Sequence, residues 1–209
     1  MTSVFNPGPS GFLPVNLLGG RVYAGATRSI PIASGYAQNI GFGDLVTYTT
    51  DGTIVRLDTT SGSKTSATKP VGIFVGCYYS QSSGLKYPLH AQNWVSGTVA
   101  SDAYAVVVDD PDAVFQVTLT NTSGAVYTSG GATQADVGAN VGYYQPATFV
   151  NASGNSTVSA TLPSATTAGL PFRIVAVVPE SILPVDNSYT QVQVIYNAGM
   201  QFYRQTAGI

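Results

Sequence analysis

Residues 43–79 read GDLVTYTTDGTIVRLDTTSGSKTSATKPVGIFVGCYY, and this stretch indicates the fold class. Asp51 and Gly52 separate two runs rich in β-branched and aromatic residues, which is typical of a β-hairpin with a two-residue turn. Pairing outward from that turn places Tyr48 opposite Val55, and cross-strand partners share a face of the hairpin. The pattern therefore predicts one mostly polar face and one buried apolar face, which carries Val46, Tyr48, Val55 and Leu57.

The end of the same stretch predicts a strand that is covered on both sides. Residues 71–77 form a nearly continuous apolar run after Pro70, and such a run is typical of a fully buried strand. Gly72 and Gly76 within it indicate close approach by another backbone. Cys77 is the one cysteine of the chain, so it has no partner for an internal disulfide and is expected to be a small buried hydrophobe.

The composition points to the same fold class. Charged residues make up 9% of the 209 residues, against about 25% in an average globular protein. Helix surfaces normally use Glu, Lys and Arg, and the chain has one glutamate and three lysines, so we expect no long helix. The net charge of −2 does not provide the basic surface on which nucleic-acid affinity mainly depends, and we expect no direct nucleic-acid partner.

The rest of the chain predicts further strands separated by turn residues. Residues 190–196 alternate cleanly and place Val192, Val194 and Tyr196 on one face. A helical turn fits only residues 133–137. The other expected strands lie within 21–32 and at 94–100, 103–108, 114–119, 142–150 and 171–179. We therefore predict an all-β fold, an antiparallel β-barrel or jelly-roll-like sandwich, with a single β domain at 21–196, an extended N-terminal arm at 1–20 and a C-terminal tail at 197–209.

Both ends of the chain are more apolar than free ends need to be. The arm contains prolines and glycines, which resist helix and central strand, so its apolar side chains are expected to lie on its own barrel or on a neighbouring subunit. The tail is expected to dock in a similar way. The predicted partner-contact residues are Phe5, Phe12, Leu13, Leu17 and Leu18 in the arm and Met200, Phe202, Tyr203 and Ile209 in the tail.

Few residues are candidates for chemistry. Asp109, Asp110 and Asp112 flank Pro111 between two apolar runs, which favours a turn, with a Ca²⁺ site as the alternative because Ca²⁺ prefers oxygen ligands. His90 is the single histidine and has no partner at a spacing typical of a zinc site or a catalytic triad. We predict no enzyme activity, no cofactor and no metal, although a carboxylate pair from distant positions would leave no local pattern.

The start of the chain, MTSVFNPGPSG, lacks the basic and apolar regions of a signal peptide. No apolar stretch approaches the ~20 residues that cross a bilayer. We therefore expect synthesis in the cytoplasm and no membrane partner.

Several segments in order carry a resemblance to a known class of proteins. They are GDLV with its Asp-Gly turn, KPVGIFVGC, VVVDDPDAVFQ, PFRIVAVV and the ending YRQTAGI. From residue 21 onward the chain resembles head decoration or cement proteins of tailed bacteriophages, of the marine and cyanobacterial phage type. The resemblance implies a capsid-stabilising virion protein on the capsid exterior, made in the host cytoplasm. It also implies binding to the major capsid protein and assembly as a homo-oligomer, a trimer or dimer.

A second class of function remains open from the residues. A receptor- or glycan-binding β module of a phage tail or bacterial surface structure would stack exposed aromatic rings on sugars. Trp94 and the pairs Tyr78 with Tyr79 and Tyr143 with Tyr144 are the candidates. The structural alternative is that alternate members of each pair lie in the core.

Overall fold

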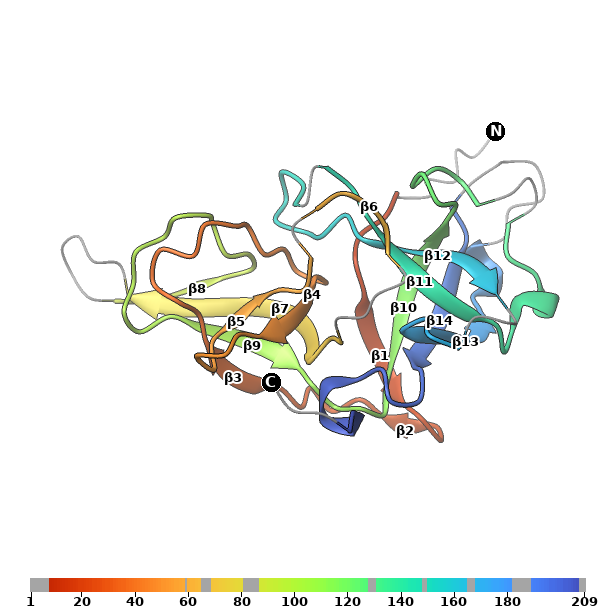
Figure 1. The fold of residues 1–209 in the computed structure, drawn as a ribbon, viewed down its shortest axis with the longest axis horizontal. Helices are drawn as coiled ribbons and strands as arrows, with labels where there is room; N and C mark the ends of the chain where they lie inside the picture. The colour runs from red at the N-terminus through yellow and green to blue at the C-terminus, as the bar shows by residue number, and fades with distance from the viewer. Residues whose placement is uncertain are drawn as a thin grey trace.

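Two small β-barrels lie side by side along the long axis of the computed structural model (Figure 1). The structure describes residues 8–58, 60–64, 69–80, 87–127, 131–147, 150–164, 168–181 and 189–206. In this part of the chain the secondary structure is fourteen strands and three 3₁₀ helices of three residues each, η1 (Gln134–Asp136), η2 (Pro179–Ser181) and η3 (Phe202–Arg204). The predicted all-β class is confirmed. Among the described residues, no helix is long and apolar enough to span a membrane.

The larger barrel is closed by one parallel strand pair. Its ring runs β12 (Ser159–Ser164), β11 (Asn140–Gln145), β13 (Phe172–Val177), β14 (Gln191–Tyr196) and β10 (Ala113–Thr120), and β10 pairs in parallel with β12. β1 (Leu13–Leu17) and β2 (Arg21–Val22) extend the sheet beyond β10, and β6 (Gly62–Lys64) pairs with β11. Val192, Val194 and Tyr196 all face its core, as their alternation predicts.

The smaller barrel has the strand order β3 (Arg28–Pro31), β9 (Tyr104–Val108), β7 (Gly72–Ser80), β4 (Leu45–Tyr48) and β5 (Ile54–Arg56). A single bridge between Ile32 and Ile54 joins its two ends, and β8 (Pro88–Ala91) pairs with the far end of β7. Trp94 and Phe74 are fully buried in its core. The predicted strand at 94–100 is wrong beyond its first residue, because only Trp94 forms a bridge, with Ile40.

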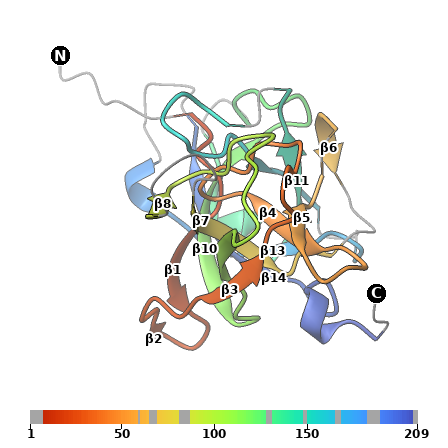
Figure 2. The same cartoon turned by 90° about the vertical axis from the view of Figure 1, so that its left-hand side faces the viewer.

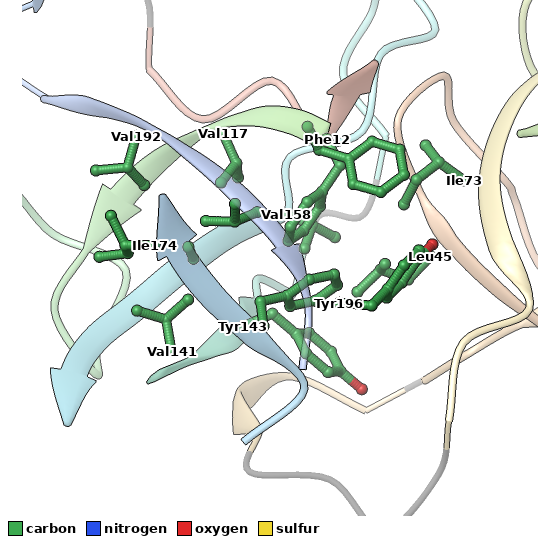
Figure 3. Packing of buried hydrophobic residues seen from close by; sticks show 14 of the residues in the cluster. Phe12, Leu45, Ile73, Val117, Val141, Tyr143, Val158, Ile174, Val192 and Tyr196 are labelled. Carbon is green, nitrogen blue, oxygen red and sulfur yellow. The ribbon is translucent and has the colours of Figure 1, made fainter. Parts of the chain in front are cut away.

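The two cores lie on opposite faces of the small-barrel segments that contain β4, β5 and β7. Leu45, Leu57 and Ile73 come from the small barrel but pack into the core of the larger one; Figure 3 shows Leu45 and Ile73. Val46, Ile54 and Phe74 lie on the opposite faces of the same strands, in the small core. β7 is thus covered on both sides, as predicted, and a Cβ at Gly72 would collide with the Val108 carbonyl oxygen.

The predicted register of the 45–57 hairpin is wrong by one residue. Tyr48 pairs with Ile54 and Thr47 with Val55, and the Thr49 N–H donates to the Thr53 carbonyl at 2.9 Å. The loop therefore contains three residues and ends at Gly52 with φ of +73°, the pattern of a type I turn followed by a left-handed residue. Ile54 takes the place expected for Val55, so the hairpin has two buried faces instead of one.

The fold includes residues on both sides of the expected domain at 21–196. β1 belongs to the larger sheet, and the tail beyond Tyr196 contacts the small barrel through Gln201 and Phe202. The chain also crosses between the barrels four times: β3 to β5 lie in the small one, β6 in the larger, β7 to β9 in the small one, and β10 to β14 in the larger. Neither barrel is a continuous segment of sequence.

Candidate interaction surface

The turn at residues 109–112 carries the chain from the small barrel to the larger one, and both the β1–β2 hairpin and the segment at η3 contact it. The Asp112 N–H donates to Asp110 Oδ1 at 2.8 Å, and the Ala113 N–H to the Asp110 carbonyl at 3.1 Å. Proline and Asp provide this turn chemistry, so the prediction of a turn is confirmed.

The carboxylates on either side of the turn hold arginines from β2, β3 and η3. Arg28 Nε lies 2.8 Å from Asp109 Oδ2. Asp112 is shared, because Arg204 Nη2 lies 2.7 Å from its Oδ1 and Arg21 Nη2 lies 3.8 Å from its Oδ2. In the described residues, no group of three or more His, Cys, Asp or Glu is placed to hold a metal ion.

The C-terminal segment docks on the same turn. The Tyr203 hydroxyl donates to Asp109 Oδ2 at 3.0 Å and lies 3.3 Å from the Tyr48 hydroxyl, while the Arg28 guanidinium lies 5.3 Å from the centre of the Tyr203 ring. Burial, followed by the Tyr48 hydroxyl and the Asp109 carboxylate, raises the pKa of Tyr203. The ring centres of Phe202 and Tyr48 lie 5.3 Å apart, so η3 packs against the small barrel.

The N-terminal hairpin of β1 and β2 lies on the other side of the turn. The Leu18 N–H donates to the Asp112 carbonyl at 2.8 Å. Figures 1 and 2 both place β2 and the C-terminal segment at the same lower end of the molecule, with the turn between them in Figure 2. We call this region the turn surface; it comprises Leu18, Arg21, Val22, Arg28, Asp109, Asp112, Tyr203 and Arg204.

The structure brings some predicted contact residues to this surface and removes others. Leu18 and Tyr203 are exposed there, at 46% and 40%. Leu13, Leu17, Met200 and Phe202 are half-buried, and Leu17 and Phe202 pack against their own cores. Phe5 and Ile209 lie outside the described residues.

Phe12 is a correction to the predicted contacts. Its ring is fully buried in the larger core (Figure 3) and stacks on Phe172, with the ring centres 4.7 Å apart. The expected arm therefore joins the fold from this residue onward, because the preceding Gly11 makes a backbone hydrogen bond to Val158 in the larger barrel.

The sequence analysis did not single out Val22, which is 82% exposed on the turn surface. The arginines were also missed. Three of the five arginines of the chain gather on the turn surface. The cluster of aspartates was the available signal, because close carboxylates in a chain with few charges attract the scarce cations.

The aromatic candidates for sugar stacking divide as the structural alternative expected. Trp94, Tyr79 and Tyr143 are buried in the cores, whereas Tyr78 and Tyr144 are half-buried. Trp94, Tyr79 and Tyr143 are therefore not surface rings.

Comparisons with family models, with curated proteins and with solved structures found no match.

Proposed function

We propose that this chain is a non-enzymatic virion structural protein, a decoration or cement protein that binds the outer surface of the major capsid lattice and stabilises the head. The turn surface is the observation that carries the proposal. It presents Leu18, Val22 and Tyr203 to solvent next to arginines, and aromatic and arginine side chains are the residues that most often dominate binding energy at protein interfaces.

The interactions that order the turn surface suit a protein whose function is to bind another protein. The β1–β2 hairpin, η3 and the crossing from β9 to β10 are tied together by hydrogen bonds and ion pairs. A surface that is already ordered loses less conformational freedom on binding. A homo-oligomer that touches several lattice subunits would gain further from the effective concentration of each additional contact.

The test is co-sedimentation of the protein with purified heads that lack decoration. The intact protein should sediment with the heads and raise their melting temperature. Val22→Thr combined with Leu18→Ser should weaken binding, whereas Val99→Thr, which changes an exposed valine on the small barrel, should not. Failure of the intact protein to bind heads would refute the proposal.

One observation favours the glycan-binding alternative. Tyr104, Tyr78 and His90 are direct cross-strand partners on β9, β7 and β8, and their rings lie 5.4 Å and 5.6 Å apart. A row of rings across three strands is a surface on which sugars could stack. Binding to host-surface glycans that is lost in Tyr78→Ser and kept in Tyr144→Ser would favour this second function.

A further inference from the structure

The charges of the turn surface are arranged in two layers. The side chains of Arg21, Arg28 and Arg204 are 67%, 59% and 52% exposed, whereas those of Asp109 and Asp112 are 14% and 33% exposed. The guanidinium groups therefore cover the carboxylates that hold them. A partner approaching this end of the molecule meets the positive layer first.

These arginines retain donors for a further ligand. A guanidinium has five N–H donors in a planar fork that matches a carboxylate, and the ion pairs described here use one nitrogen of each arginine. Arg21 and Arg204 sit on the two oxygens of the same Asp112 carboxylate. Arg204 is held there by a hydrogen bond of 2.7 Å to Asp112 Oδ1, which lowers the ordering cost of binding for this arginine.

Exposed apolar groups flank the arginines. Leu18 and Val22 lie on the side of Arg21, and Tyr203 lies on the side of Arg204. Apolar contacts around a charged pair exclude water, and this strengthens the pair's electrostatic attraction.

We infer that the turn surface docks on an acidic protein surface, a patch of Asp and Glu side chains whose carboxylates take the free donors of Arg21 and Arg204. The inference rests on the proposed function and deepens it, because it gives the chemistry of the lattice site. A nucleic acid is the disfavoured partner, since the chain carries a net charge of −2 and nucleic-acid affinity depends mainly on an extended basic surface.

The first experiment measures binding of the intact protein to undecorated heads at about 50 mM and about 300 mM salt, where screening differs strongly. Binding should weaken as salt rises. Arg21→Glu combined with Arg204→Glu should lower the affinity by about tenfold or more at low salt and remove most of the salt dependence. Arg173→Glu is the matched control, because Arg173 is an exposed arginine on β13 of the larger barrel, and it should bind within about twofold of the intact protein.

Thermal melts check that the double variant folds; if it does not, Arg21→Gln with Arg204→Gln replaces it, since this pair removes charge without adding repulsion to Asp112. If the charge variant binds heads as tightly as the intact protein does, the inference is wrong. An equal loss of binding in the Arg173 control would also overturn it.

A second experiment separates this inference from the proposed function. The isotope-labelled protein is titrated with a hexaglutamate peptide and, separately, with a short DNA duplex, and its amide signals are followed by NMR. The peptide should shift signals of residues 18–22, 109–112 and 202–205 in the intact protein and not in the double variant. If heads do not bind but the peptide shifts occur, the proposed function fails and the surface chemistry stands. If the peptide shifts nothing, or if DNA shifts these signals more strongly, the inference is wrong.

Discussion

Ser156 Oγ donates a hydrogen bond to Asp44 Oδ1 at 2.6 Å across 112 positions of sequence. Ser156 precedes β12 of the larger barrel and Asp44 precedes β4 of the small one. Asp44 also accepts from the Gly41 N–H at 2.7 Å and from Arg56 Nη2 at 3.1 Å, and both charged side chains of this pair are almost completely buried. A buried ion pair thus lies where the two barrels join.

Asp44→Ala should destabilise the protein by about 3 to 5 kcal/mol, because it leaves the Arg56 guanidinium buried without its carboxylate. Ser156→Ala should cost less, about 1.5 to 3 kcal/mol, because one hydrogen bond to a charged group is lost. Urea unfolding measures both. Ser123→Ala, which changes an exposed serine, should be close to neutral. A loss below 1 kcal/mol for Asp44→Ala would contradict the prediction.

The same carboxylate predicts an unusual pH dependence. Burial raises the pKa of Asp44 from 3.8 to about 6, against the opposing effects of Arg56, Ser156 and Gly41. The folded state then holds the proton more tightly than the unfolded state. The stability contributed by Asp44 is therefore fully present below about pH 4 and is lost as pH rises through about 6.

Over this range the free energy of unfolding should fall with rising pH by up to about 3 kcal/mol, relative to Asp44→Asn, which does not titrate. Urea unfolding of both proteins at several pH values gives the difference and cancels the other carboxylates. If the difference in unfolding free energy between the intact protein and Asp44→Asn stays constant or rises with pH, Arg56 keeps Asp44 ionised and the prediction is wrong.

Gly52→Ala should destabilise the hairpin by about 1 to 2 kcal/mol, because φ at this position is +73° and a Cβ is unfavourable in the left-handed region. Gly169→Ala is the control: Gly169 is not among the glycines with positive φ, and nothing lies within 4 Å of a Cβ there. Thermal melts compare the two. Equal effects would mean that the turn does not need glycine.

Cys77 should react slowly with an aromatic disulfide reagent in the native protein. Burial raises the pKa of its thiol to about 11, so at about pH 8 little thiolate forms, and the thiolate is the reactive species. Reaction should accelerate strongly in urea. Rapid reaction of the native protein would show that the small barrel opens readily.

Phe202→Ala should destabilise the protein by about 1 to 3 kcal/mol, since its ring packs against Tyr48 and the small core. Thr206→Ala, on an exposed side chain nearby, should have little effect. Denaturant melts measure both variants. A neutral Phe202→Ala would mean that the tail contributes nothing to the fold and is free for other contacts.

The sequence pattern predicts the strands well and their partners less well. Alternation identified the 190–196 strand because one face of β14 is in the core and the other is not. The hairpin register failed for the opposite reason: both of its faces are buried, so Val55 and Ile54 are equally acceptable to the pattern. The three-residue loop, closed by the hydrogen bond from the Thr49 N–H to the Thr53 carbonyl, sets the observed register. The second barrel was missed because its strands are interleaved in the sequence with those of the first.

The turn surface was predicted in part, from apolar side chains in segments without a regular pattern. Leu18 and Tyr203 are exposed on this surface, and their contact with a partner stays a prediction. Phe12 is buried instead, because a glycine-rich segment can bury a ring in its own chain as easily as present it to a partner. The ion pairs of Arg21, Arg28 and Arg204 join residues that lie far apart in sequence, and pairings of this kind have no local signature.

The four crossings between the barrels constrain the order in which a growing chain acquires its structure during synthesis. All strands of the small barrel have been made once Val108 is added, whereas β1 must wait for β10 and the ring of the larger barrel stays open until β14 emerges. Contacts between residues so far apart form slowly. The early apolar segments around Phe12 therefore remain without their partner strands for most of translation, and transiently exposed apolar surface of this kind favours aggregation.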